Sequence, residues 1–411
     1  MAKIVAKFGG TSVADVARIE RAADKIKREV DLGHKVAVVV SAMSGVTNAL
    51  IEHCSDIYSL YDASEYDSVV SSGEQVTAGL MAIALQKRGI SARSWLGWQV
   101  PIICSELHGR ARILEIDPTE LNKRLDDNEV AVLAGFQGIT HAGRIATLGR
   151  GGSDTTAVAL AAALGADRCD IYTDVEGVFT TDPRIVPAAS KLNAISYEEM
   201  LEMASSGAKV LQTRSVEMAF KREVPVQVLS SFGDKIGSEL PGTMVVKEDE
   251  TMEEHVVNGI TYSRDDAKIT LLNLKDIPGV AAKVFGPLSE ANVNVDMIVQ
   301  DISTDGKLTD MTFTVPRSDV NRAKEALSKA DDLKGAKIVS STDVAKISVV
   351  GIGMRSHAGV AQQMFAALAD KGINIQVIST SEIKISVLIA EEYTELAVRT
   401  LHSVYGLENI A

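Results

Sequence analysis

The sequence predicts an α/β protein: a three-layer domain with a mainly parallel sheet, followed by two smaller α+β modules. Two observations lead to this prediction. Residues 1–245 alternate β-branched runs with helical patterns, and several runs are apolar throughout, as expected for strands buried on both faces. Further along, residues 279–298 align without gaps on residues 359–378, which indicates two copies of one structural unit.

Six strands and four helices are expected in the first domain. The strands are residues 4–8, 36–41, 130–136, 145–148, 169–173 and 224–229, and the helices are residues 13–30, 73–88, 154–164 and 197–221. Ser72 and Gln75 have the spacing of a capping box, while Gly89 and Gly165 stand where their helices should end. Strands that alternate with helices predict a parallel sheet covered on both faces.

The repeat organises the second half of the chain. Its copies are offset by 80 residues, are identical at seven positions, and each reads as strand, glycine turn, helix, two strands and helix. The acidic stretch 246–262 reads as a linker that ends in a first strand of the modules. We expect the modules at 263–335 and 336–411. An alternative is a nested arrangement, in which residues 256–262 give a strand to the more distant module.

Composition and charge exclude several classes of protein. A net charge of −13, a pI of about 5.1 and 4% aromatic residues disfavour a nucleic-acid or anionic-membrane surface. Cys54, Cys104 and Cys169 lack metal-ligand spacing and are expected to be reduced thiols. No apolar run could span a bilayer and the N-terminus has no signal-peptide pattern, so a cytoplasmic location is expected.

Two glycine clusters follow predicted strands and precede predicted helices. They are KFGG at 7–10 and GRGG at 149–152. Backbone N–H groups at such turns bind anions, and Lys7 and Arg150 add a cation to each cluster. The alternative is that the glycines only permit tight turns, but two clusters that each carry a cation favour phosphate binding. The P-loop, the dinucleotide fingerprint and the protein-kinase motifs are absent.

A third segment is suited to contact a nucleotide. YTDVEGVFTTDPRIV (172–186) continues a predicted strand into a polar loop, and nucleotides bind off the carboxyl ends of strands in open α/β sheets. Arg184 in this loop is a candidate phosphate ligand; the alternative is a surface arginine. Lys209 lies in SSGAKVL, which reads as being near a helix start, where a cation is unfavourable. This suggests an anionic partner; the alternative is a solvated lysine.

With these motifs the chain resembles the aspartate kinases of the amino-acid kinase family over essentially its whole length. The resemblance is carried by KFGGTS (7–12), VVVSAMSGVTN (38–48), SSGEQ (71–75), GFQGIT (135–140), LGRGGSDTTA (148–157), YTDVEGVFTTDPRIVP (172–187) and GAKVLQTRSVE (207–217). It implies an amino-acid kinase fold for the catalytic domain at 1–245 and ferredoxin-like βαββαβ ACT domains for the two modules. It also implies the monofunctional form, without the homoserine dehydrogenase domain that some members carry.

The resemblance implies transfer of the ATP γ-phosphoryl group to the side-chain carboxylate of L-aspartate, giving 4-phospho-L-aspartate, on the way to lysine, threonine and methionine. The implied catalytic residues are Lys7, Asp154 and Lys209. The residues implied to bind ATP are Lys7, Gly9, Gly10, Thr173, Asp174, Phe179, Arg184 and Lys209, and those implied to bind aspartate are Ser41, Thr47, Glu74, Arg150 and Ser153. Mg²⁺ is expected to arrive with ATP, without a site made of protein ligands alone.

The modules resemble effector-binding domains, with lysine, threonine or both as inhibitors. The residues implied to bind effectors are Asp276, Pro278, Gly279, Ala281, Gln300, Ser356, His357, Gly359, Val360, Asn374, Gln376, Ser379 and Thr380. The alternative is that the modules only join subunits. We expect a homo-oligomer through the ACT domains, or a hetero-oligomer with a shorter regulatory subunit from an internal start at Met252.

Three alternative functions are compatible with parts of the sequence. An amino-acid kinase acting on glutamate or acetylglutamate is disfavoured by SGEQ and by the tandem modules. A catalytically inactive amino-acid sensor is disfavoured by the presence of both lysines, Arg150 and Asp154. A nicotinamide-dependent dehydrogenase would need the glycine fingerprint that this chain lacks.

Overall fold

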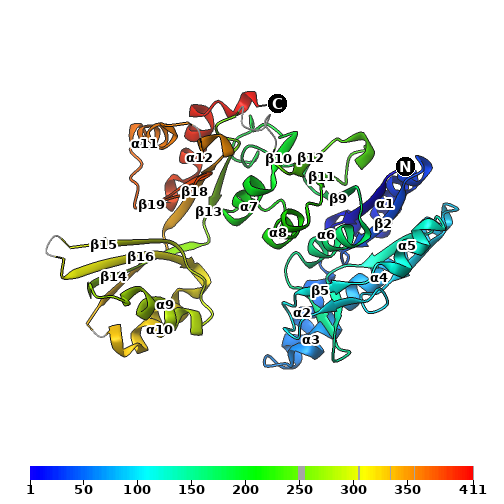
Figure 1. Cartoon of the computed structure of the whole chain (residues 1–411), viewed down its shortest axis with the longest axis horizontal. Helices are drawn as coiled ribbons and strands as arrows, with labels where there is room; N and C mark the ends of the chain where they lie inside the picture. The colour runs from blue at the N-terminus through cyan, green and yellow to red at the C-terminus, as the bar shows by residue number, and fades with distance from the viewer. Residues whose placement is uncertain (249–254, 304–305, 334, 356, 411) are drawn as a thin grey trace.

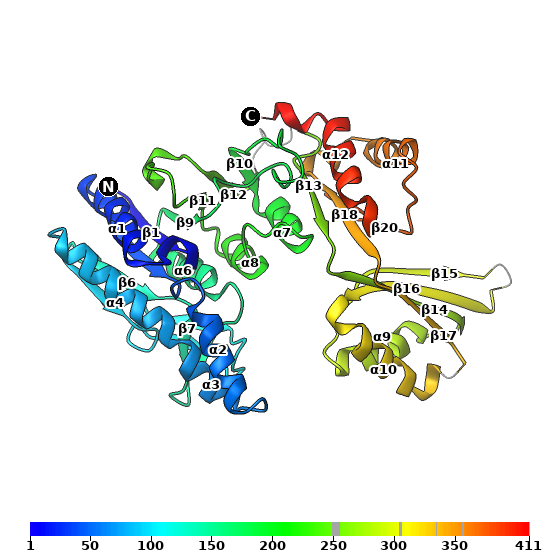
Figure 2. The ribbon, with the colours of Figure 1, turned by 180° about the vertical axis from the view of Figure 1, so that it is seen from behind.

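The computed structural model describes residues 1–248, 255–303, 306–333, 335–355 and 357–410. Figure 1 shows a first domain in blue to green, with the module of α11 and α12 (orange to red) close to α7. The module of α9 and α10 (yellow) lies farther from the first domain, and Figure 2 shows the same separation from behind. No helix in the described ranges is long and apolar enough to cross a membrane.

The first domain is built on an eight-stranded sheet in the order β10-β12-β11-β9-β1-β2-β6-β3. Its strands are β1 (Lys3–Phe8), β2 (Lys35–Val40), β3 (Ala92–Trp95), β6 (Val130–Ala134), β9 (Arg168–Thr173), β10 (Ala194–Ser196), β11 (Val226–Ser230) and β12 (Thr243–Val246). All neighbouring strands are parallel except β11 and β12. The predicted mainly parallel sheet is confirmed.

Helices cover both faces of this sheet. They are α1 (Val16–Asp31), α4 (Ser72–Lys87), α5 (Thr119–Asp126), α6 (Gly152–Leu164), α7 (Tyr197–Ser205) and α8 (Thr213–Arg222). Successive residues of β2 belong to different buried clusters: Val38 lies in the cluster that contains residues of α1 and α4, and Val39 in the cluster that contains residues of α5 and α6. The three-layer α/β prediction is therefore confirmed.

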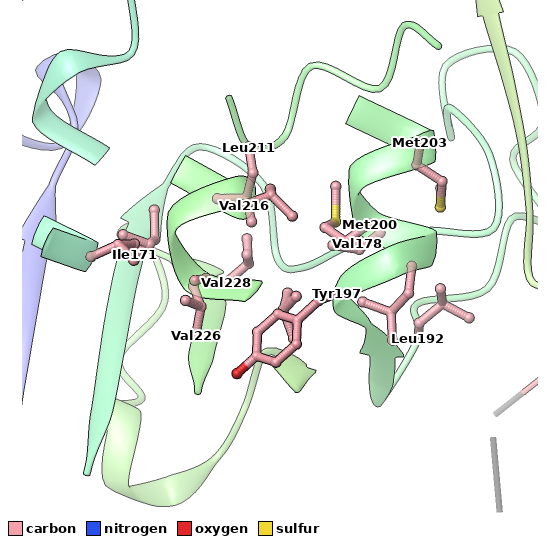
Figure 3. Packing of buried hydrophobic residues seen from close by; sticks show 14 of the residues in the cluster. Ile171, Val178, Leu192, Tyr197, Met200, Met203, Leu211, Val216, Val226 and Val228 are labelled. Carbon is pink, nitrogen blue, oxygen red and sulfur yellow. The ribbon is translucent and has the colours of Figure 1, made fainter. Parts of the chain in front are cut away.

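Figure 3 shows part of the second cluster, between the helices α7 and α8 and the strands β9 and β11. Tyr197, Met200 and Val216 of the helices lie over Ile171 and Val228 of the strands. All five side chains are almost completely buried. Because burying one such side chain is worth about 1.5–3 kcal/mol, this cluster fixes both helices, and the loop that joins them, on the sheet.

Two local predictions are wrong. The helix expected at 197–221 is divided into α7 and α8, because Gly207 takes a left-handed φ of +118° and the chain leaves the helix there. Ser72 and Gln75 form no capping box. The preceding residue, Ser71, already has helical φ and ψ because α3 ends directly before it, so α4 has no extended cap residue.

A second sheet, in the order β5-β4-β7-β8, extends the first domain. Its strands are β4 (Ile102–Cys104), β5 (Ile113–Ile116), β7 (Gln137–Thr140) and β8 (Ile145–Thr147). The strand predicted at 145–148 lies here and not in the parallel sheet, because β7 and β8 form an antiparallel hairpin. Two helices that were not predicted, α2 (Val46–Ile57) and α3 (Ala63–Val70), lie at this end of the domain (Figure 1).

The two C-terminal modules are four-stranded antiparallel sheets, each accompanied by two helices. The sheet β15-β16-β14-β17 contains β14 (Asp266–Lys275), β15 (Asp296–Ile302), β16 (Leu308–Pro316) and β17 (Lys337–Ser341), with α9 (Val280–Glu290) and α10 (Val320–Lys329). The sheet β13-β18-β20-β19 contains β13 (Gly259–Ser263), β18 (Val344–Val350), β19 (Val377–Thr380) and β20 (Lys384–Ala390), with α11 (Val360–Asp370) and α12 (Thr394–Val404). The predicted α+β modules are confirmed.

The modules are nested in sequence. β13 precedes the first module, yet it pairs with β18 of the second, in the place that β17 takes beside β14 in the first. A boundary between residues 335 and 336 would separate β17 from the sheet in which it pairs. We therefore propose that the first module spans 266–341 and that the second combines β13 with residues from 344 onward.

Candidate active site

The carboxyl ends of five parallel strands meet at one edge of the large sheet. Backbone hydrogen bonds join the residues found there: Gly9 N to Tyr172 O (3.2 Å), Ser41 N to Phe8 O (3.1 Å), Gly135 N to Val40 O (3.0 Å) and Ser231 N to Thr173 O (2.8 Å). Open α/β sheets bind ligands at this edge. Because β1 lies between β9 and β2, the KFGG turn stands at its centre.

Lys7 is buried near the carboxyl end of β1, and its ammonium pairs with the carboxylate of Asp154. Asp154 lies in the first turn of α6, where the helix dipole favours a negative charge. Lys7 Nζ is 3.3 Å from the position that a Cβ would take on Gly9. The ammonium is therefore held beside the backbone of the glycine turn, with a fixed counter-charge behind it.

The GRGG loop is shaped by glycines with left-handed backbone. Gly149 and Gly151 have φ values of +77° and +70°, and Gly151 is the N-cap of α6. A side chain on Gly151 would also collide with Gln212, the residue that precedes α8. This approach brings the loop that carries Lys209 against the GRGG loop. Arg150 and Lys209 are both exposed, so their cations are accessible to an anionic ligand.

Glu74 lies in the first turn of α4 with its carboxyl group buried. Its Oε1 accepts a hydrogen bond from Ala42 N (3.1 Å), whereas Oε2 has no hydrogen-bond partner among the described residues. Burial raises the pKa of Glu74 to about 7. A buried carboxyl group with one free oxygen is suited to accept a cationic group such as an ammonium.

Ser41, Thr47 and Ser153 lie around the same end of the sheet. Ser41 directly follows β2, and Thr47 lies in the first turn of α2. Ser153 lies over the end of β6, since a Cβ on Gly135 would come within 2.8 Å of Ser153 Oγ. Gly73 lets α4 approach the segment after β2. These short contacts gather the predicted aspartate ligands on one side of the KFGG turn.

Apart from Lys209 and the residues of the KFGG turn itself, the nucleotide-binding candidates lie on the other side of that turn, along the loop after β9. Thr173 and Asp174 begin the loop, and Thr173 Oγ1 donates to Asp174 Oδ1 (3.2 Å). Phe179 and Arg184 lie farther along it. The side chain of Arg184 is 85% exposed, and its Nε and Nη2 donate to the carboxylate of Asp182 at 2.8–3.2 Å. In this conformation Arg184 is paired with its own loop.

The effector candidates lie at two helix starts and along two neighbouring strands. Gly279 and Gly359 are the N-caps of α9 and α11, with φ values of +90° and +102°. β15, which carries Gln300, contacts β19, and Gln376 Oε1 accepts a hydrogen bond from Lys268 Nζ (2.6 Å) between the modules. The remaining described candidates flank these features: Asp276, Pro278, Ala281, His357, Val360, Asn374, Ser379 and Thr380. Ser356 lies outside the described residues.

Three residues without a role predicted from the sequence hold the candidate loops in place. Asp182 pairs with Arg184, Gln212 lies against Gly151, and Arg214 of α8 donates to Leu148 O just before the GRGG loop. Asp182 precedes Arg184 by two residues, which is the only local signal for its role. Gln212 and Arg214 lie in the GAKVLQTRSVE motif, but the sequence does not show what they contact, because these contacts are made across the fold.

Comparisons with known proteins agree with this architecture. Residues 2–230 match the model of the amino acid kinase family, and residues 272–330 and 347–405 match that of the ACT domain. An aspartate kinase of Stutzerimonas stutzeri is 54% identical over 410 residues, which cover 99% of this chain and 98% of the relative. An aspartokinase of Pseudomonas aeruginosa is also 54% identical, over 411 residues that cover 99% and 98% of the two chains.

A solved structure of E. coli aspartokinase III, in complex with aspartate and ADP (R-state), matches with a TM-score of 0.81 at 28% identity, covering 98% of this chain and 99% of that one. The same enzyme with lysine and aspartate (T-state) matches with a TM-score of 0.74 at 28% identity, covering 97% and 98%. From the kinase domain, the ACT repeat and these relatives, the chain belongs to the amino acid kinase family, among its aspartate kinases.

Proposed function

We propose that this chain transfers the γ-phosphoryl group of ATP to the side-chain carboxylate of L-aspartate, giving 4-phospho-L-aspartate. The observation that carries the proposal is the ammonium of Lys7, fixed by Asp154 beside the KFGG turn at the centre of the sheet edge. Glu74 and Ser153 lie on one side of this turn and Thr173 on the other. A cation between an amino-acid site and a nucleotide site is the arrangement that this reaction needs.

The chemistry calls for cations more than for a base. An aspartate side chain has a pKa near 3.9, so its nucleophilic oxygen is already ionised at neutral pH. The difficulty is that one anion must approach a more highly charged one. Lys7, Lys209 and backbone N–H groups of the two glycine loops would offset that repulsion as the phosphoryl group moves, and catalysis rests on positioning and electrostatics.

Mg²⁺ would accompany the nucleotide and neutralise charge on its phosphate oxygens. Within the described part of the chain, no three His, Cys, Asp or Glu side chains gather in a metal-binding group. Asp154 at the site is engaged by Lys7, while Asp174 is exposed at the nucleotide side. This donor set suits a Mg²⁺ ion held mainly by phosphates and water, with Asp174 as a candidate carboxylate ligand.

Aspartate would be held by charge complementarity at both ends. Arg150 is placed to bind a carboxylate through its forked N–H groups, and Glu74 to accept the ammonium. The hydroxyls of Ser41, Thr47 and Ser153 supply neutral donors around them. Glutamate, longer by one methylene, would place its carboxylate differently against the same fixed groups.

The Glu74 role predicts a pH dependence. Its pKa of about 7 means that Glu74 is partly protonated near neutrality, and a bound ammonium favours the ionised form. We therefore expect the KM for aspartate to fall as the pH rises from about 6 to about 8. Glu74→Gln should raise KM by ~10²-fold at pH 8, since removing one partner of a buried charge pair costs about 2–5 kcal/mol. Steady-state kinetics of both proteins across this range check this.

The same pKa predicts the stability of the ligand-free protein. Because the folded-state pKa of Glu74 lies above its usual 4.5, the group stabilises the fold below pH 4.5, and this contribution is lost as the pH rises through 7. Between pH 5 and 8, the melting temperature of Glu74→Gln should thus fall less than that of the parent protein. The proposed role of Glu74 would be contradicted if KM and melting temperature depended on pH in the same way in both proteins.

We also propose that the ACT modules bind lysine, threonine or both and inhibit the enzyme, which would place the reaction at the start of lysine, threonine and methionine synthesis. Support comes from the equivalent glycine-capped starts of α9 and α11, whose N–H groups suit an amino-acid carboxylate. We expect inhibition, together with a rise in the melting temperature, on adding lysine and threonine. If neither effector, alone or combined, changes activity or melting, the modules serve another purpose.

We also propose that the enzyme is cytoplasmic. It would form homo-oligomers through its ACT modules, or join a shorter regulatory subunit. Met252, the candidate internal start, lies outside the described residues. Mass measurement of the protein expressed from its own gene would separate a single chain from two products.

The reaction itself is tested by ATP-dependent hydroxamate formation. Hydroxylamine traps an acyl phosphate, so aspartate should give product and glutamate should give little. Product from glutamate instead would favour a different amino-acid kinase, and no product from either would favour an amino-acid sensor.

A further inference from the structure

Asp67 of α3 is a completely buried carboxylate that lies outside every set of residues discussed above. We propose that Asp67 is a positioning residue: it fixes the GRGG loop in the conformation from which Arg150 binds the substrate carboxylate. The inference rests on the proposed role of Arg150. Asp67 should therefore affect the binding of the amino-acid substrate and not that of the nucleotide.

Among the described residues, the hydrogen bonds that the Asp67 carboxylate accepts come from two short segments. Gly109 N donates to both carboxylate oxygens at 3.0 Å, and His108 Nδ1 lies 2.8 Å from Oδ2. The other donors are Thr147 N, 3.0 Å from Oδ2, and Thr147 Oγ1, which bonds to Oδ1. One buried charge thus ties the turn at residues 105–111 to the last residue of β8. Such a charge is tolerated only when its oxygens are well satisfied, as they are here.

Both segments adjoin the GRGG loop. Thr147 is followed by Leu148 and then by the loop itself, and Ala111 N donates to Thr147 O (2.9 Å). A Cβ on Gly149 would lie 3.0 Å from Gly109 O, so the turn held by Asp67 lies directly against the loop. The position of Gly109 therefore sets the position of Gly149, the neighbour of Arg150.

The opposite side of the loop is held by α8. Arg214 donates to Leu148 O and to Ala111 O (2.9 Å), and Gln212 lies against Gly151. Arg150 is exposed between these two supports, and it makes no hydrogen bond or ion pair with the described residues. The backbone is thus preorganised while the guanidinium stays available for a ligand, which is what binding a carboxylate with two parallel bonds requires.

The first test uses Thr147, whose side chain is fully buried. Thr147→Val removes the hydroxyl that bonds to Asp67 and keeps the shape, whereas Thr147→Ser keeps the hydroxyl and removes a methyl group. We expect Thr147→Val to raise the KM for aspartate about tenfold while the KM for ATP stays within twofold of the parent value. Thr147→Ser should leave both constants close to the parent values. Equal effects of Val and Ser on the KM for aspartate would show a packing role and overturn the proposal.

Asp67→Asn should have a larger effect, because an amide NH₂ would face N–H donors where the carboxylate accepted their bonds. We expect KM for aspartate to rise by tenfold or more, with a lower melting temperature. Asp170→Asn is the matched control: Asp170 is equally buried but bonds to Arg168 and Gln227, away from the GRGG loop. It should lower the melting temperature and leave KM for aspartate unchanged.

A double-mutant cycle with Arg150→Ala decides whether Asp67 acts through Arg150. Once the guanidinium is gone, Thr147→Val and Asp67→Asn should raise KM for aspartate no further. Additive effects would overturn the inference even if each single variant behaves as expected. Absence of aspartate phosphorylation by the parent protein would instead refute the proposed function, so the two failures are distinguishable.

Discussion

Lys7→Ala is expected to lower kcat by ~10²–10³-fold, the effect typical of removing one preorganised electrostatic group from an active site. The ammonium of Lys7 is buried and fixed by Asp154, so it needs no reorganisation when negative charge shifts between ATP and aspartate. KM for aspartate should change much less than kcat, because the contact strengthens as the phosphoryl group moves. Steady-state kinetics with both substrates varied measure this.

Lys3→Ala is the matched control, since Lys3 lies at the other end of the same strand and also uses its ammonium in fixed bonds, to Asn122 Oδ1 and Leu164 O (both 2.8 Å). Lys3→Ala should lower the stability of the protein and leave kcat close to the parent value. Near-normal turnover of Lys7→Ala, or an equal loss of kcat in Lys3→Ala, would contradict a catalytic role for Lys7.

Arg150→Ala is expected to raise KM for aspartate by ~10²-fold while KM for ATP stays close to normal. A forked pair with a carboxylate is worth about 1.5–3 kcal/mol, and each 1.4 kcal/mol is a factor of ten in affinity. Arg150→Lys should recover only part of the affinity, because an ammonium cannot form the two parallel bonds. The measurement is KM for each substrate with the other saturating.

Arg144→Ala serves as the control for a lost surface charge. Arg144 is an exposed arginine in the β7–β8 turn, and it pairs with Glu65 of α3. Its kinetics should match the parent. A rise in KM for ATP on removing Arg150, with KM for aspartate unchanged, would move this residue to the nucleotide side of the site.

The layers of the fold could be predicted because they depend on local pattern. The apolar runs of β1, β2 and β9 are buried on both faces. The repeat of residues 279–298 at 359–378 predicted two similar modules. The place of β13 could be stated only as an alternative, the nested arrangement, because its partner β18 lies beyond the whole first module and no local pattern identifies that partner. The break between α7 and α8 did have a local signal in Gly207, which was outweighed by the helical residues around it.

The site could be predicted where its residues stand in glycine-rich motifs at strand ends, as Lys7 and Arg150 do. The residues that support the GRGG loop could not be predicted. Asp67 lies in a helix without any motif, and its partners follow 41 and 80 residues later in the chain. Only folding brings this carboxylate to the GRGG loop, so no local pattern reports it.

In the proposed reaction, the side-chain oxygen of aspartate becomes bonded to the γ-phosphorus of ATP at this site. ³¹P NMR of the reaction with L-aspartate carrying ¹⁸O only in its side-chain carboxylate tests it directly. We expect an acyl-phosphate signal that shows the isotope shift of a P–¹⁸O bond and that disappears when hydroxylamine is added. An acyl phosphate without the shift, or no acyl phosphate while both substrates are bound, would contradict it.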